Sequence, residues 1–167
     1  MNQKAMKAAL KKYLPLDKAV DVNDRVVLRI LEIDAEREKY ALKALEKHFS
    51  ENILPILALY LTLQNGEDLS DNALEMTRKI TEEMYLIGRK RMAFLGRFSF
   101  FYRLIKRMTP KMMKDFFPSE GWDIEWLEVS KKRVAFNMHA CFYLDSLTKY
   151  GVPELTPVFC GLDDLIY

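Results

Sequence analysis

The sequence predicts an α+β fold, with an N-terminal helical bundle packed on a small antiparallel sheet and short helices at the C-terminus. Two patterns support this prediction. Through the first two-thirds of the chain, apolar residues recur at the spacing of helices that bury one face. From Trp122 onward, apolar and polar residues alternate as they do in half-buried strands. We therefore expect no strand between residues 25 and 105.

A short helix and then a long one are predicted at the N-terminus. The apolar face of the first helix runs from Met6 to Tyr13, and Pro15 lies near its end. The second helix keeps the helical period through Val27–Leu45, so we expect it to end near Phe49.

The apolar stretch Ile53–Leu63 is predicted to be a buried helix. Ser50 or Asn52 can cap it, because a short side-chain oxygen accepts a free backbone N–H at that position. Its eleven residues include Pro55 and are too few for a bilayer span, which needs about twenty. Asn65-Gly66 is expected to end the helix with a turn.

Two more helical stretches are expected before the sheet. Ser70-Asp71-Asn72 opens the first, which Gly88 either breaks or merely dents. Residues 89–109 form the second, and Thr109-Pro110 is expected to stop it because proline lacks a backbone N–H.

The later part of the chain is predicted to form a hairpin and two short helices. Trp122–Trp126 and Val134–Met138 alternate in polarity and are separated by a polar turn, which favours an antiparallel pair. A helix over Phe142–Tyr150 is expected to end at Gly151. Thr156-Pro157 is typical of the start of a last helix.

Length and composition favour one domain over residues 1–167. The chain is half apolar, which is enough for a sizeable core. Its formal net charge of +2 selects no class of partner. Two cysteines without a secretory pattern are typical of a reducing compartment. We therefore predict a cytoplasmic protein without a transmembrane segment, and no disulfide between Cys141 and Cys160.

Three short elements near the C-terminus carry a family resemblance. They are Asn137-x-x-x-Cys141-x-Tyr143, Tyr150-Gly-Val-Pro-Glu-Leu and Cys160-x-x-Asp163-Asp164. Together they resemble the C-terminal signature of the L-2-amino-thiazoline-4-carboxylic acid hydrolase family. The resemblance is better over residues 94–167 and looser over residues 50–75. Members of that family usually continue past the second cysteine, so the chain is expected to lack the C-terminal end of the domain.

The resemblance implies hydrolysis of a small-molecule substrate, a cyclic isothiourea that is attacked at C2 and opened to a carbamoyl-cysteine. Cys141 occupies the family's signature cysteine position, and we expect it to act as the nucleophile or as a polarising thiol. Asp163 is the expected acid–base partner, and Cys160 is expected to line the pocket. Arg97 or Arg103 is expected to hold the substrate carboxylate, because a guanidinium binds a carboxylate through two parallel hydrogen bonds. No cofactor is predicted.

The residues themselves leave the cysteine chemistry open. His139 and Cys141 share a face if the strand extends that far, and an imidazole favours the nucleophilic thiolate. Alternatively, both cysteines are small core residues, since free cysteine is among the most buried residue types. We expect Cys141 on a pocket wall, close to the helix that bears Asp163, and Cys160 packed in the interior.

Other polar residues have simpler interpretations. His139, Cys141, Cys160 and an aspartate could bind zinc, but no CxxC, HxxxH or HExxH spacing supports such a site, and no metal is predicted. His48 is expected to be a solvated residue near a helix end. Glu154 suits the first turn of a helix better than the role of a general base.

The basic segment of residues 88–114 contains nine bases and no acid, and it has three interpretations. It could lie on an anionic membrane surface or bind nucleic acid. We favour a core helix, because Leu95, Phe98, Tyr102 and Ile105 fall on one face. Nucleic-acid binding is the least expected of the three.

Two functions compete with the hydrolase. One is a non-catalytic small-molecule-binding or interaction domain that uses the same pocket, since a fold does not determine an activity. The other is a peripheral binder of anionic surfaces through the basic segment. The sequence selects no oligomeric state.

Overall fold

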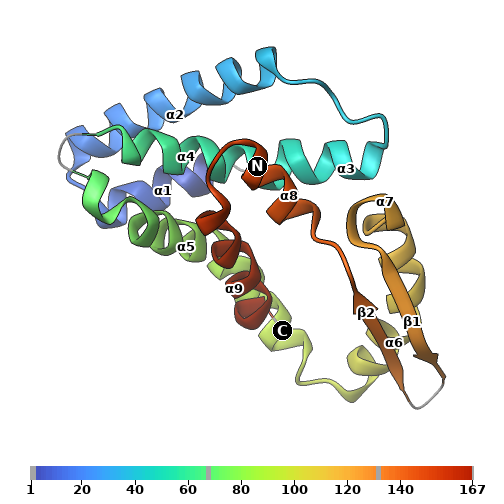
Figure 1. Cartoon of the computed structure of the whole chain (residues 1–167). Helices are drawn as coiled ribbons and strands as arrows, with labels where there is room; N and C mark the ends of the chain where they lie inside the picture. The colour runs from blue at the N-terminus through green and yellow to red at the C-terminus, as the bar shows by residue number, and fades with distance from the viewer. Residues whose placement is uncertain (1–2, 67–68, 131–132, 167) are drawn as a thin grey trace.

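Helices form most of the structure, and one hairpin is the only sheet in the part that is described (Figure 1). The computed structural model describes residues 3–66, 69–130 and 133–166. The elements before the hairpin are α1 (Gln3–Tyr13), α2 (Leu16–Glu36), α3 (Lys43–His48), α4 (Leu54–Gln64), α5 (Ala73–Leu95), α6 (Ser99–Phe116) and α7 (Ser119–Trp122). The hairpin and the elements after it are β1 (Ile124–Val129), β2 (Val134–Met138), α8 (Phe142–Lys149) and α9 (Thr156–Ile166). The α+β prediction is confirmed, and no described residue between 25 and 105 is in a strand.

The core surrounds α4. Nine of the eleven residues of this helix are buried, as expected for a helix that is apolar on all sides. It packs against α2 and α5, and α5 also contacts α1 and α9. We call α1, α2, α4, α5 and α9 the helical body. Asn65 follows the last residue of α4, which confirms the predicted end of the helix.

The long helix predicted to reach Phe49 is interrupted, and this prediction was wrong. α2 ends at Glu36, and Arg37 has an extended backbone. The guanidinium of Arg37 donates to Glu46 over 2.8 Å and to Asp34 over 2.9 Å, and only 5% of the side chain is exposed. The bond to Glu46, nine residues further along the chain, accompanies a break in the helix at a place where the apolar period continues.

The predicted cap at Ser50 or Asn52 is also wrong. The π-helical segment Phe49–Ile53 joins α3 directly to α4, so no helix starts there, and no side-chain cap is present. The N–H of Leu54 donates to the carbonyl of Phe49, five residues earlier. The side chain of Asn52 is therefore free to bond elsewhere.

The boundary between α5 and α6 also differs from the prediction. α5 opens after the 3₁₀ turn Ser70–Asn72, as expected, and continues through Gly88 to Leu95. Pro110 lies inside α6 and does not stop it. In the preceding turn Thr109 Oγ1 donates to the carbonyl of Ile105 over 2.9 Å.

The hairpin lies beside α6, and β2 contacts that helix (Figure 1). β1 and β2 are antiparallel, with Trp126 opposite Phe136 and an irregularity between Trp126 and Glu128. This confirms the predicted hairpin, but Trp122 is buried in α7 and does not lie in the strand. The last helices also follow the prediction: Gly151 has a φ of 72° just after α8, and α9 begins at Thr156.

Candidate functional site

Cys141 lies just before the first turn of α8. It is half-buried, and its Sγ accepts a hydrogen bond from the backbone N–H of Leu144 over 3.5 Å. The first N–H groups of a helix lack intrahelical acceptors and carry partial positive charge, so they favour a negatively charged thiolate. The expected position of Cys141 in front of a helix is confirmed.

His139 and Cys141 do not share a strand face, because β2 ends at Met138. Instead, His139 Nε2 lies 2.9 Å from Glu125 Oε2 on the exposed side of the hairpin. The hydrogen bond with His139, followed by the one with Asn137, lowers the pKa of Glu125 below its usual value. The two residues therefore form a surface pair at the base of the hairpin.

Cys160 is exposed on α9, so the prediction that it packs in the interior was wrong. The buried face of this helix carries Val158, Phe159 and Leu162 instead. Neither Cys141 nor Cys160 is in a disulfide, as predicted. Asp163 lies in α9, but its side chain is outside the described part of the structure.

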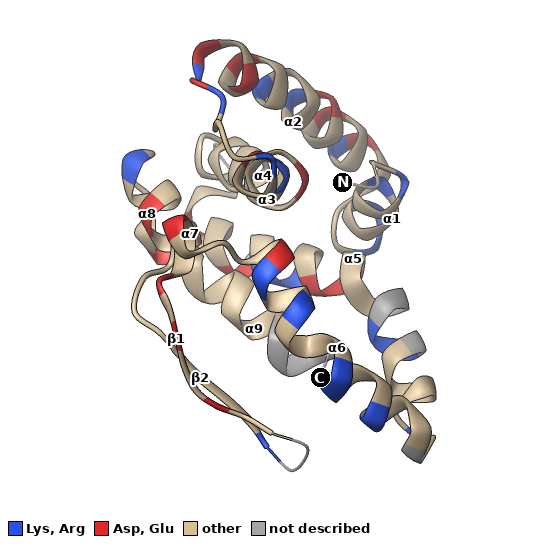
Figure 2. Ribbon diagram, turned by 90° about the vertical axis from the view of Figure 1, so that its right-hand side faces the viewer, with Lys and Arg blue, Asp and Glu red and all other residues tan. Residues whose placement is uncertain are grey.

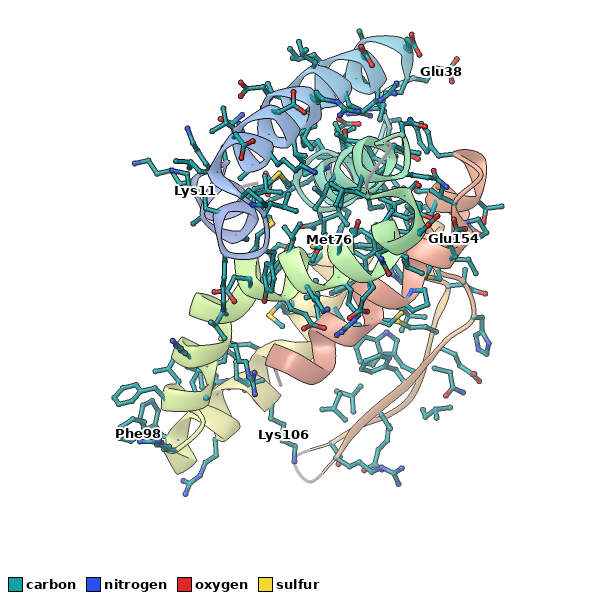
Figure 3. All side chains as sticks on the ribbon, turned by 90° about the vertical axis from the view of Figure 1, so that its left-hand side faces the viewer. Lys11, Glu38, Met76, Phe98, Lys106 and Glu154 are labelled. Carbon is teal, nitrogen blue, oxygen red and sulfur yellow. The ribbon has the colours of Figure 1, made fainter. Side chains whose placement is uncertain are left out.

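Arg97 and Arg103 are both exposed. Arg97 lies in the turn between α5 and α6, which Figure 1 places well away from the start of α8. Its neighbour Phe98 lies at the far end of the molecule from Glu154 in Figure 3. The described contacts therefore do not bring the predicted carboxylate-binding residues to Cys141.

The structure instead reveals a polar network beside the signature segment. His48, at the end of α3, lies with Nδ1 3.0 Å from the hydroxyl of Tyr143 and Nε2 2.7 Å from the carbonyl of Phe116. Asn52 donates to the same hydroxyl over 3.3 Å. We call His48, Asn52 and Tyr143 the His48 network. The prediction that His48 is solvated was wrong, since its side chain is half-buried.

The backbone carbonyl of Phe116 determines which ring nitrogen of His48 carries the hydrogen. A carbonyl oxygen can only accept, so Nε2 carries the hydrogen, and Nδ1 of the neutral ring accepts from Tyr143. Burial lowers the pKa of His48 below its usual value, and the charge of Lys47 acts in the same direction. The ring also contacts Trp122 and Phe117, with centroids 4.8 and 5.3 Å away. The network therefore joins α3, α6, α7 and α8 around a neutral imidazole.

Two sequence features could have indicated this network. His48 and Asn52 are four residues apart, so they share a face of a helix. Tyr143 is two residues after the signature cysteine. The spacing could not show that the two segments meet, because they are separated by about ninety residues of sequence.

Glu154 connects the signature element Tyr150-Gly-Val-Pro-Glu-Leu to the core through a hydrogen bond. The buried Tyr60 of α4 donates its hydroxyl hydrogen to Glu154 Oε1 over 2.9 Å. Burial and then this bond raise the pKa of Tyr60 above its usual value. Glu154 lies in the first turn of the 3₁₀ helix Pro153–Leu155, which agrees with the structural role preferred from the sequence.

Two of the open hollows on the described surface lie beside α7 and beside α2. The larger, of about 490 Å³, lies between the end of α6, α7 and β1, and Lys114, Phe117 and Trp126 are among its lining residues. The smaller, of about 290 Å³, lies between α2 and the turn after α4. Neither is lined by Cys141, so its place on a pocket wall stays a prediction. Among the described residues, no group of three His, Cys, Asp or Glu side chains could hold a metal ion.

Comparison with known proteins identifies a family. No curated protein and no solved structure matches the chain. Within the described residues, no helix is both long and apolar enough to cross a membrane. The family model described as L-2-amino-thiazoline-4-carboxylic acid hydrolase matches residues 32–167, a range that includes the His48 network and both cysteines. The chain belongs to the L-2-amino-thiazoline-4-carboxylic acid hydrolase family.

Proposed function

We propose that the protein is a hydrolase that opens a cyclic isothiourea such as 2-amino-thiazoline-4-carboxylate to a carbamoyl-cysteine. The family match over residues 32–167 carries this proposal. The proposed substrate is a small molecule with one electrophilic carbon, C2, held between sulfur and nitrogen. Water adds to this carbon, one ring bond to it breaks, and the departing ring atom takes up a proton.

Cys141 is the proposed reactive group. Either the thiolate adds to C2 and is later displaced by water, or the protonated thiol donates a hydrogen bond to the ring and so polarises C2 for direct attack by water. Its position at the N-terminus of α8 supports this role, because the free N–H groups there stabilise negative charge. Asp163, in α9, is the proposed proton donor to the departing atom, and α8 and α9 are in contact.

The His48 network is proposed to position this group. Tyr143 lies in the first turn of α8, two residues from Cys141, and is held by Asn52 and His48. Phe142, which lies between Cys141 and Tyr143 in the sequence, packs against Trp122. These contacts hold the start of α8 on both sides, and reacting groups must keep their orientation for efficient catalysis.

Turnover of 2-amino-thiazoline-4-carboxylate by the purified protein tests the proposal, with carbamoyl-cysteine quantified as the product. Cys141→Ala should lower kcat by at least about 100-fold. Cys160→Ala is the matched control, because the second thiol is exposed and has no proposed part in the bond changes. Equal turnover by wild type and Cys141→Ala would show that Cys141 is not the nucleophile. Absence of turnover in the wild type would leave the non-catalytic binding domain as the better interpretation.

A further inference from the structure

One face of α6 exposes a continuous row of large apolar side chains. Phe100, Leu104 and Met108 are 60%, 46% and 49% exposed. They are four residues apart, so they follow one another along one side of the helix. We call these three residues the exposed stripe.

The exposed stripe continues onto the end of α5. The ring of Phe98 lies 5.7 Å from that of Phe100 and 5.6 Å from that of Phe94. Phe94 and Phe98 are themselves exposed. This contradicts the core-helix interpretation of the basic segment at Phe98, which was expected to be buried. Five large apolar side chains therefore form one exposed surface at this end of the molecule, where Figure 3 shows Phe98.

A row of bases runs beside the exposed stripe. Arg103, Arg107 and Lys111 are exposed and are also four residues apart. Figure 2 shows Lys and Arg along α6 and on the end of α5, whereas α2 carries many of the acids. The helix thus presents an apolar row flanked by positive charge.

The residues of the exposed stripe are not part of the buried core of the described structure. Ile105, Thr109 and Met113 form a third row, about 100° around α6 from the exposed stripe and on the side away from the bases, and these residues are half-buried or buried. Contiguous exposed apolar surface is uncommon on a protein without a partner for it. The outward side of α6 is therefore available to a partner.

We infer that this surface binds the anionic face of a phospholipid bilayer, with α6 lying in the plane of the membrane and the exposed stripe inserted among the acyl chains. An apolar row flanked by Lys and Arg is the pattern of helices that lie at membrane interfaces. The absence of acids from residues 88–114 provides charge complementarity to anionic headgroups. At 18 residues, α6 is about 27 Å long, and its apolar row covers the half that leads from α5.

Two other partners fit the same surface less well. A nucleic acid would stack its bases on the Phe rings, but Leu104 and Met108 offer no flat ring for stacking. A second copy of the chain that met this face with the same face would bring two basic rows together, which like charges oppose. A bilayer accommodates the rings, the aliphatic side chains and the bases together.

Flotation of the full chain with phospholipid vesicles tests the inference. We expect binding to phosphatidylcholine vesicles that contain about 30 mol% phosphatidylserine and much weaker binding to pure phosphatidylcholine. Binding should fall steeply between about 0.1 M and about 1 M sodium chloride, because salt screens the attraction. Arg107→Gln with Lys111→Gln should weaken binding by about 30-fold. The matched control Lys7→Gln with Lys11→Gln removes two exposed charges from α1 and should change binding less than about twofold.

A second pair of variants tests the apolar part. Phe100→Ser with Leu104→Ser should weaken vesicle binding by at least about tenfold. Leu28→Ser with Leu31→Ser on α2 is the matched control, because these leucines are 60% and 61% exposed. Circular dichroism and thermal unfolding check that each variant is folded. The inference is overturned if the protein binds neutral and anionic vesicles equally well. It is also overturned if each control pair weakens binding as much as its test pair, or if the protein binds single-stranded DNA more tightly than vesicles in a salt-sensitive way.

Discussion

Large apolar side chains are buried in the helical body but exposed along one side of α6. Leu57, Leu59 and Leu63 of α4 have no exposed surface, whereas the exposed stripe of α6 faces outward along about two turns. α4 carries no charged residue and α6 carries six, but both helices contain large apolar side chains. The difference lies in the neighbours: α4 has α2 and α5 on its sides, and β2 is the main described neighbour of α6. Residues in the body are therefore expected to contribute most to stability, whereas those of the exposed stripe are available for contacts outside the chain.

The largest expected difference is between two leucines. Leu57→Ala should lower the free energy of unfolding by about 2–5 kcal/mol, because it removes buried methyl groups and leaves a cavity. Leu104→Ala should change it by less than about 0.5 kcal/mol, because the side chain is already in water. Urea unfolding followed by circular dichroism measures both. Similar losses in the two variants would mean that α6 is packed as tightly as α4.

Two arginines sharpen the comparison between buried and exposed contacts. Arg37 and Arg78 each bind two carboxylates, but the side chain of Arg37 is nearly buried and that of Arg78 is not. Arg37→Ala should cost about 1–3 kcal/mol of unfolding free energy, because Glu46 and Asp34 each lose one of their partners at the break between α2 and α3. Arg78→Ala should cost less than about 1 kcal/mol. Urea titration at one pH compares them, and a larger cost for Arg78 would contradict the expectation.

The smallest effect is expected at His48 of α3, which joins α8 to the end of α6. Burial lowers its pKa in the folded state, so the unfolded chain binds the proton more readily. The contribution of His48 is thus fully present above about pH 6.5 and falls as the pH drops below that value. Urea midpoints at about pH 7.5 and about pH 5.5 should differ more in the wild type than in His48→Gln. An identical pH dependence in both proteins would assign the change to other groups.

Local pattern predicted the elements but not the contacts between distant segments. The hairpin, the buried helix α4 and the turn at Gly151 follow from alternation, apolar length and glycine conformation, which act over a few residues. The break at Arg37 and the burial of His48 depend on bonds to residues that the period does not connect. Exposure was the least predictable property, as Phe98 and Cys160 illustrate. A helical period identifies a face but does not show what, if anything, covers it.

For the candidate site, the resemblance located the segment and the coordinates added its surroundings. Cys141 was expected in front of a helix because a strand pattern precedes it and a helical one follows. The catalytic roles of Cys141 and Asp163 stay predictions. Tyr143 and Asn52 were not expected to take part, since an aromatic and an amide each have many ordinary structural roles.

The π-helical segment before α4 fixes the direction in which His48 points. A hydrogen bond that spans five residues holds one more residue than a regular turn, and each residue of a helix advances by about 100°. If α4 continued backwards into α3 as a regular α-helix, the residues of α3 would lie about 100° around the helix axis from their actual positions. The segment is equivalent to a single-residue insertion that the helix absorbs without breaking. The meeting of His48 with Tyr143 thus depends on the number of residues in this turn as much as on their identity.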